Sequence, residues 1–99
     1  AHFGAEIKTD KGRCYKFDDS ICMLDFVKEN QDKKVAAYFV HNFNGNNELL
    51  DATQGVFVYS KDLESPMKGN LACFKTKQEA LQFLQSHYGS LRTWEELTK

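Results

Sequence analysis

The chain contains an internal repeat at a spacing of 57 positions, the distance from Gly12 to Gly69. The same shift matches two residues suited to begin a helix and the apolar positions that follow each of them. The matched pairs are Phe17 with Phe74, Asp19 with Thr76, Leu24 with Leu81, Phe26 with Phe83 and Val27 with Leu84. Chance matches apolar positions easily but seldom matches caps and turn glycines as well. The pattern therefore favours two copies of one unit over an ordinary α+β domain whose halves happen to look alike.

The first half predicts the order strand, strand, helix, strand. Alternating apolar and polar residues indicate a hairpin, Asp18 and Asp19 are suited to cap a helix, and a continuous apolar run indicates a buried strand. The expected ranges are 3–9 and 13–17 for the hairpin, about 20–29 for the helix, 35–40 for the third strand and 41–47 for a loop.

The second half predicts the same order. Thr76 and Glu79 have the spacing of a capping box at a helix start, and Gly89 is typical of a helix end. The expected ranges are 55–60 and 69–74 for strands around a polar loop at 61–68, 77–88 for the helix, 91–94 for a last short strand and 95–99 for a frayed tail.

These elements predict an α+β fold of two tandem ββαβ units that share a compact core. We expect residues 1–99 to form a single domain, divided into a first unit at 1–47 and a second unit at 48–99. The hydrophobic content of 41% is enough for such a core to form without a metal or a disulfide framework.

Charge and motifs exclude several functional classes. The net charge is −1, with 13 basic and 14 acidic residues spread along the chain, which argues against nucleic-acid binding. The sequence has no apolar run of the roughly 20 residues that cross a bilayer. It also lacks GxSxG, P-loop and HExxH motifs, and its adjacent acidic pairs are not spaced across a cleft. We therefore expect a protein that is not an enzyme.

Sulfur-containing side chains are the most distinctive candidates for chemistry. Copper(I) prefers thiolate and thioether ligands because a soft metal suits a soft donor. Met67 lies in a polar loop without periodic apolar neighbours, which favours a binding role over packing more than for a methionine in an apolar pattern. Met23, beside Cys22, lies on the apolar face of the first helix, where packing is the favoured interpretation. The sequence has three cysteines, Cys22 together with Cys14 and Cys73, and an odd number excludes a fully paired disulfide framework.

Short blocks along nearly the whole chain resemble the NosL family in order and spacing. The blocks are Phe3-Gly4-Ala5-Glu6, Tyr15-Lys16-Phe17-Asp18-Asp19, Cys22-Met23, Ala37-Tyr38-Phe39-Val40-His41, Asp51-Ala52-Thr53, Val56-Phe57-Val58, Ser65-Pro66-Met67-Lys68-Gly69-Asn70 and Glu79-Ala80. The resemblance implies two similar ββαβ units, in agreement with the repeat. It also implies a copper-binding lipoprotein of the bacterial envelope that delivers copper to an apoprotein such as that of nitrous oxide reductase.

The resemblance places Met67 at the family's Pro-Met position and Met23 at the methionine of the first helix. We therefore expect Met67 to bind copper(I), with Met23 or Cys22 as the nearest supporting sulfur and His41 in reserve. Family members usually carry a Cys-rich segment with a nearby Met before the block at Phe3, where this sequence starts. Weakened or absent copper(I) binding is thus one expectation for the chain as it stands.

Location and partner follow from the same resemblance. We expect the periplasm or the outer membrane, with membrane contact only through a lipid anchor upstream of residue 1. The alternative function is an envelope protein-interaction domain that binds no metal, in which the sulfur residues are core packing.

Overall fold

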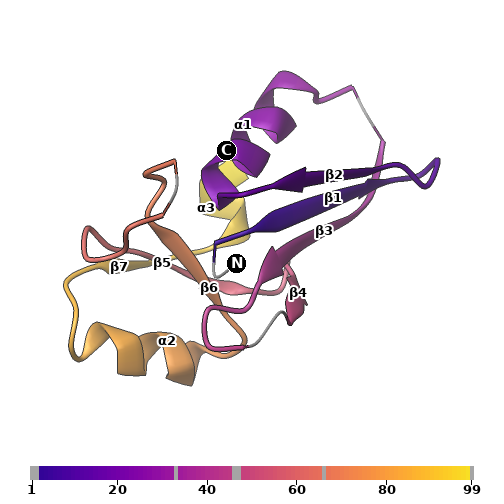
Figure 1. Ribbon diagram of the computed structural model, residues 1–99. Helices are drawn as coiled ribbons and strands as arrows, with labels where there is room; N and C mark the ends of the chain where they lie inside the picture. The colour runs from indigo at the N-terminus through magenta and orange to yellow at the C-terminus, as the bar shows by residue number, and fades with distance from the viewer. Residues whose placement is uncertain (1–2, 33, 46–47, 66, 99) are drawn as a thin grey trace.

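The computed structural model describes residues 3–32, 34–45, 48–65 and 67–98 (Figure 1). Pro66 of the predicted loop therefore lies outside the described residues. The elements in chain order are β1 (Ala5–Thr9), β2 (Cys14–Phe17), α1 (Ser20–Glu29), β3 (Val35–His41), β4 (Leu49–Asp51), β5 (Val56–Tyr59), β6 (Leu71–Phe74), α2 (Lys77–Leu84), β7 (Ser90–Arg92) and α3 (Trp94–Thr98). No helix in these ranges is long and apolar enough to cross a membrane.

Two small antiparallel sheets confirm the predicted α+β fold. The first has the order β2-β1-β3-β4 and the second has the order β6-β5-β7. In both, the first strand of the unit is flanked by its hairpin partner and by the strand that follows the helix. Helix α1 packs on the first sheet and α2 on the second, at opposite ends of the molecule (Figure 1).

The repeat extends to side-chain packing. Strands β2 and β6 occupy ranges related by the 57-position shift, and so do the starts of α1 and α2. In the first unit the rings of Phe17 and Phe26 lie 5.6 Å apart, and in the second the matched rings of Phe74 and Phe83 also lie 5.6 Å apart. Each unit thus fixes its helix on its hairpin with the same aromatic pair.

The core consists of two hydrophobic clusters, one beneath α1 and a second beneath α2, and each unit contributes side chains to both. Phe57 of the second unit is buried in the cluster beneath α1, and Trp94 packs there against Tyr38 with ring centroids 4.8 Å apart. In return, Phe43 of the first unit packs on Phe74 in the second cluster, at 5.5 Å. Separation of the two units would therefore expose apolar surface of both to water, which is unfavourable.

Strand β4 was not predicted from the sequence. It has only three residues, too few for a period-2 pattern, and it pairs with β3 through Phe39 and Asp51, Val40 and Leu50, and His41 and Leu49. It thereby extends the first sheet, although it follows the expected boundary between residues 47 and 48. That boundary stays a prediction.

The end of α2 was predicted wrongly. The helix ends at Leu84 and not at Tyr88. The backbone amides of Gln85 and Ser86 donate to carbonyls only three residues earlier, those of Gln82 and Phe83, and so close the last turn. His87, which the predicted helix would have included, lies beyond its end, is exposed and stacks on Phe83. Gly89 is not a left-handed helix exit. It lies where a side chain would collide with the carbonyl of Tyr59.

The prediction of a frayed tail is also wrong, because residues 94–98 form the helix α3. Thr93 and Glu96 make a capping box: the Glu96 amide donates to the Thr93 hydroxyl at 3.2 Å, and the Thr93 amide donates to the Glu96 carboxylate at 3.0 Å. Leu97 and Trp94 pack on the core beneath α1, and this burial stabilises a helix too short to persist alone.

Candidate metal-binding loop

Met67 lies in the connection between β5 and β6, residues 60–70, and 62% of its surface is exposed. The equivalent connection in the first unit is the short turn at residues 10–13. The extra length of the second connection is what presents the Met67 thioether at the surface. An exposed thioether is an uncharged soft donor that is available to a soft metal.

The loop closes on itself around Met67. The amide of Asn70 donates to the Ser65 hydroxyl at 2.9 Å, and the amide of Lys68 donates to the Ser65 carbonyl at 3.0 Å. Lys68 and Asn70 both adopt positive φ angles, 59° and 54°. Left-handed backbone at two non-glycine residues costs free energy, and it persists here because the surrounding hydrogen bonds fix the loop.

Asp19 connects this loop to the first unit. Its carboxylate is fully buried, and one oxygen, Oδ1, accepts the amide of Ile21 at 3.1 Å as the N-cap of α1. The other oxygen, Oδ2, accepts the amides of Met67 at 2.9 Å and Gly69 at 3.3 Å. The hydroxyl of Ser65 bonds to the same carboxylate. The predicted cap is confirmed for Asp19, and its bonds to the second unit were not foreseen.

The ionisation of Asp19 follows from these contacts. Burial alone would raise the pKa of its carboxyl group, but the hydrogen bonds from Ser65, Ile21, Met67 and Gly69 outweigh burial and lower the pKa below its ordinary value. The carboxylate is therefore ionised at neutral pH. Hydrogen bonds to a charged acceptor are stronger than those between neutral groups, so the attachment of the loop is firm.

Gly69 was expected to be a turn glycine equivalent to Gly12, but the two serve different purposes. Gly12 has a φ of 84° in its turn, whereas Gly69 is not among the residues of positive φ. A Cβ atom at Gly69 would lie 2.6 Å from the Cβ of Ile21 and 2.8 Å from Oδ1 of Asp19. The absence of a side chain lets the loop backbone approach the start of α1.

Cys22 and Met23 differ in access to the surface. Cys22 is half-buried in the first turn of α1, and the pKa of its thiol is raised by burial and then by the nearby carboxylates of Asp19, Asp25 and Asp18. Its thiol is protonated at neutral pH, and a bound metal would have to displace that proton. Met23 is fully buried in the core beneath α1, as the packing interpretation expects. A ligand role for Met23 stays a prediction.

His41 lies at the end of β3, where its amide donates to the Gly4 carbonyl at 2.9 Å. Side chains alternate along a strand, and Val40 points into the core beneath α1, so His41 belongs to the opposite face of the first sheet. Its Nδ1 atom is buried without a hydrogen-bond partner among the described residues. The reserve ligand thus lies on the face of the first sheet turned away from that core.

The remaining cysteines lie in equivalent strands but in different surroundings. Cys14 of β2 is exposed, whereas Cys73 of β6 is buried and burial raises the pKa of its thiol to about 12. Within the described part of the chain, no three His, Cys, Asp or Glu side chains gather closely enough to hold a metal. Sulfur chemistry at the Met67 loop is the remaining candidate.

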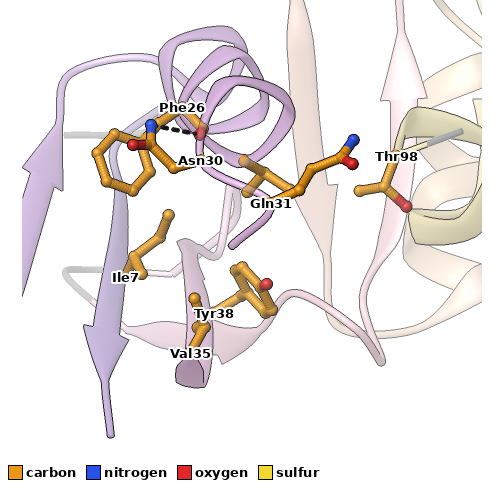
Figure 2. A pocket seen from close by; sticks show the side chains of 8 residues that line it. Ile7, Phe26, Asn30, Gln31, Val35, Tyr38 and Thr98 are labelled. Atoms are coloured by element: carbon orange, nitrogen blue, oxygen red, sulfur yellow. Dashed lines mark hydrogen bonds between the residues drawn. The ribbon is translucent and has the colours of Figure 1, made fainter. Parts of the chain in front are cut away.

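A cavity of about 260 Å³ lies at the other end of α1, between that helix, the first sheet and α3 (Figure 2). Ile7, Phe26 and Val35 give it apolar walls, and Asn30 and Gln31 contribute polar groups. The side-chain amide of Asn30 donates to the Phe26 carbonyl at 2.9 Å and so closes the helix end. Among the described residues that line this cavity there is no sulfur, histidine or carboxylate, so it offers no soft ligand for copper(I).

Comparison with known proteins identifies a family and solved structures of similar fold. The family model NosL matches residues 2–99. The crystal structure of the copper chaperone NosL from Shewanella denitrificans superposes with a TM-score of 0.83 at 18% sequence identity, over 97% of this chain and 78% of that one. At this identity the likeness shows the fold. No curated protein sequence matches the chain significantly.

Proposed function

The chain belongs to the NosL family, and we propose that it is a copper(I)-binding accessory protein that passes its metal to a copper enzyme. The observation that carries the proposal is the exposed Met67 on a loop that hydrogen bonds fix in place. The name of the Shewanella denitrificans protein, a copper chaperone of the same fold, supports this cargo.

The ligand set follows from exposure. Met67 is the first ligand, because a thioether binds copper(I) without losing a proton and can release it to a better-equipped recipient. Cys22 is the favoured second sulfur, since it is half-buried at the same end of α1, whereas Met23 is enclosed by the core. His41 would join only if the ligand set extended beyond this end of α1.

The proposal extends to partner and location. The recipient is a copper-enzyme apoprotein such as that of nitrous oxide reductase, and the protein acts in the periplasm or at the outer membrane, attached through a lipid anchor upstream of residue 1. It is a carrier and not an enzyme. Nucleic acid is not among its partners, because the net charge is −1 and no basic face is expected.

Copper(I) titration against a chromophoric chelator tests the proposal. We expect Met67→Ala to weaken copper(I) binding while changing the free energy of unfolding by less than about 0.5 kcal/mol, since exposed side chains contribute little to stability. Lys61→Ala, an exposed change in the same loop, is the matched control and should leave the affinity unchanged. Full affinity in Met67→Ala would remove Met67 from the ligand set, and no copper(I) binding by the unaltered protein would favour the envelope interaction domain whose sulfur residues only pack.

A further inference from the structure

We infer that Asp19 is the positioning residue of the Met67 loop: its carboxylate fixes the loop on the start of α1 and so sets where the thioether binds metal. The inference rests on the proposed copper(I) function. It adds a residue that offers no ligand of its own and acts through the backbone on either side of Lys68.

The geometry of Asp19 supports this role directly. Its Oδ2 atom accepts the amides of Met67 and Gly69, which are 48 and 50 residues away in sequence. Its Oδ1 atom accepts the amide of Ile21 in α1. One carboxylate therefore holds the loop of the second unit and the helix of the first unit in a single arrangement.

Helix capping alone does not require this carboxylate. Ser caps helices about as well as Asp and Thr somewhat less well, and the equivalent position of the second unit is Thr76, which caps α2 while remaining exposed. A hydroxyl could serve Ile21 but would leave the amides of Met67 and Gly69 without their acceptor. The second oxygen of Asp19 is thus needed for the loop and not for the helix.

Gly69 gives independent support. A Cβ atom there would collide with Ile21 and with Asp19, so close packing of the loop on α1 depends on this glycine. The buried carboxylate of Asp19 and the absence of a side chain at Gly69 thus both favour the contact between the loop and the start of α1, although the two residues are distant in sequence. A ligand held in place before the metal arrives loses less conformational freedom on binding.

The test compares Asp19→Ser, which keeps a helix cap, with Thr76→Ala, which removes the cap of the equivalent helix. We expect Asp19→Ser to weaken copper(I) binding about tenfold or more, as loss of a residue that orients a ligand typically does. Thr76→Ala should leave the affinity unchanged. Amide hydrogen exchange should speed up at Met67 and Gly69 in Asp19→Ser only.

A double-mutant comparison separates this inference from the proposed function. In a Met67→Ala background, Asp19→Ser should cause no further loss of affinity, because the ligand that it positions is gone. If Met67→Ala alone leaves the affinity unchanged, the proposed function fails. If Met67→Ala lowers the affinity and Asp19→Ser does not, or if Thr76→Ala lowers it equally, the inference is overturned.

Gly69→Ala covers the case in which Asp19→Ser does not fold. It keeps the carboxylate and the cap of α1 but forces the loop away from the helix. We expect the same loss of copper(I) affinity from it. Unchanged affinity in Gly69→Ala would overturn the positioning role of the contact.

Discussion

Asp19 and Thr76 begin matched helices of the two units, yet they cap them differently. Thr76 is exposed and completes a local capping box, in which the Glu79 amide donates to its hydroxyl at 3.2 Å. Asp19 is buried and divides its two oxygens between its own helix and the loop of the other unit. The same position in a repeated unit is therefore a local stop signal in one copy and a long-range attachment in the other.

The difference matches the place where the two units diverge. The connection at residues 10–13 is a short turn with a left-handed Gly12, whereas the connection at 60–70 is long enough to carry Met67. Strands β2 and β6, the starts of α1 and α2 and the aromatic pairs stay equivalent, so this shared architecture serves as the scaffold. The candidate chemistry lies in the segment that only the second unit has.

The largest expected contrast is between the matched strands β2 and β6. Cys14 is exposed, whereas Cys73 is buried with a pKa raised to about 12, so at pH 8 it is a protonated thiol out of contact with reagent. We expect iodoacetamide to modify Cys73 at least about a thousandfold more slowly than Cys14, because Cys73 must wait for unfolding. Peptide mapping by mass spectrometry measures both rates. Similar rates in the native protein would show that the two strands do not differ in this way.

A smaller contrast is expected between the matched aromatic residues of the two cores. Phe74 is fully buried and Phe17 only partly, so Phe74→Ala should lower the free energy of unfolding by about 3–5 kcal/mol and Phe17→Ala by less. Urea denaturation of both variants gives the two values. A larger loss from Phe17→Ala would mean that the first sheet, and not the second, holds the main part of the shared core.

The smallest expected contrast is in the free energy of unfolding that is lost when each cap is removed. The loss should be larger for Asp19 than for Thr76. Thr76→Ala removes an exposed cap and should cost about 1 kcal/mol. Asp19→Ala also leaves the amides of Met67 and Gly69 without their acceptor, and it should cost about 2–3 kcal/mol. Thermal unfolding of both variants provides the comparison. Equal losses would reduce Asp19 to an ordinary helix cap.

Much of the architecture could be predicted because short sequence patterns determine it. A capping box, formed by Thr76 and Glu79, marks the start of the second helix. The 57-position spacing between Phe26 and Phe83 relates the second helix to the first and so indicates the repeat. The same signal was present at Thr93 and Glu96 and would have predicted α3 instead of a frayed tail. Strand β4 could not be predicted, because three residues give no period and its position depends on pairing with β3.

The candidate site was predictable only in part. Met67 could be singled out as a methionine without apolar neighbours in sequence, and its exposure agrees with that interpretation. The attachment of its loop to Asp19 could not be found, because an N-cap aspartate looks the same in sequence whether or not its second oxygen has a partner. Only the packing of the two units brings that carboxylate to the loop, across 48 residues of chain.

The two methionines offer the most direct test of the central claim, that copper(I) binds at the exposed loop. With ¹³C-methyl-labelled methionine, each methyl group gives its own NMR resonance, and Met67→Ala assigns them. We predict that one equivalent of copper(I), added under anaerobic conditions, shifts the Met67 resonance strongly and leaves that of the buried Met23 close to its metal-free position. A Met67 resonance that does not move while the protein binds copper(I) would contradict the account.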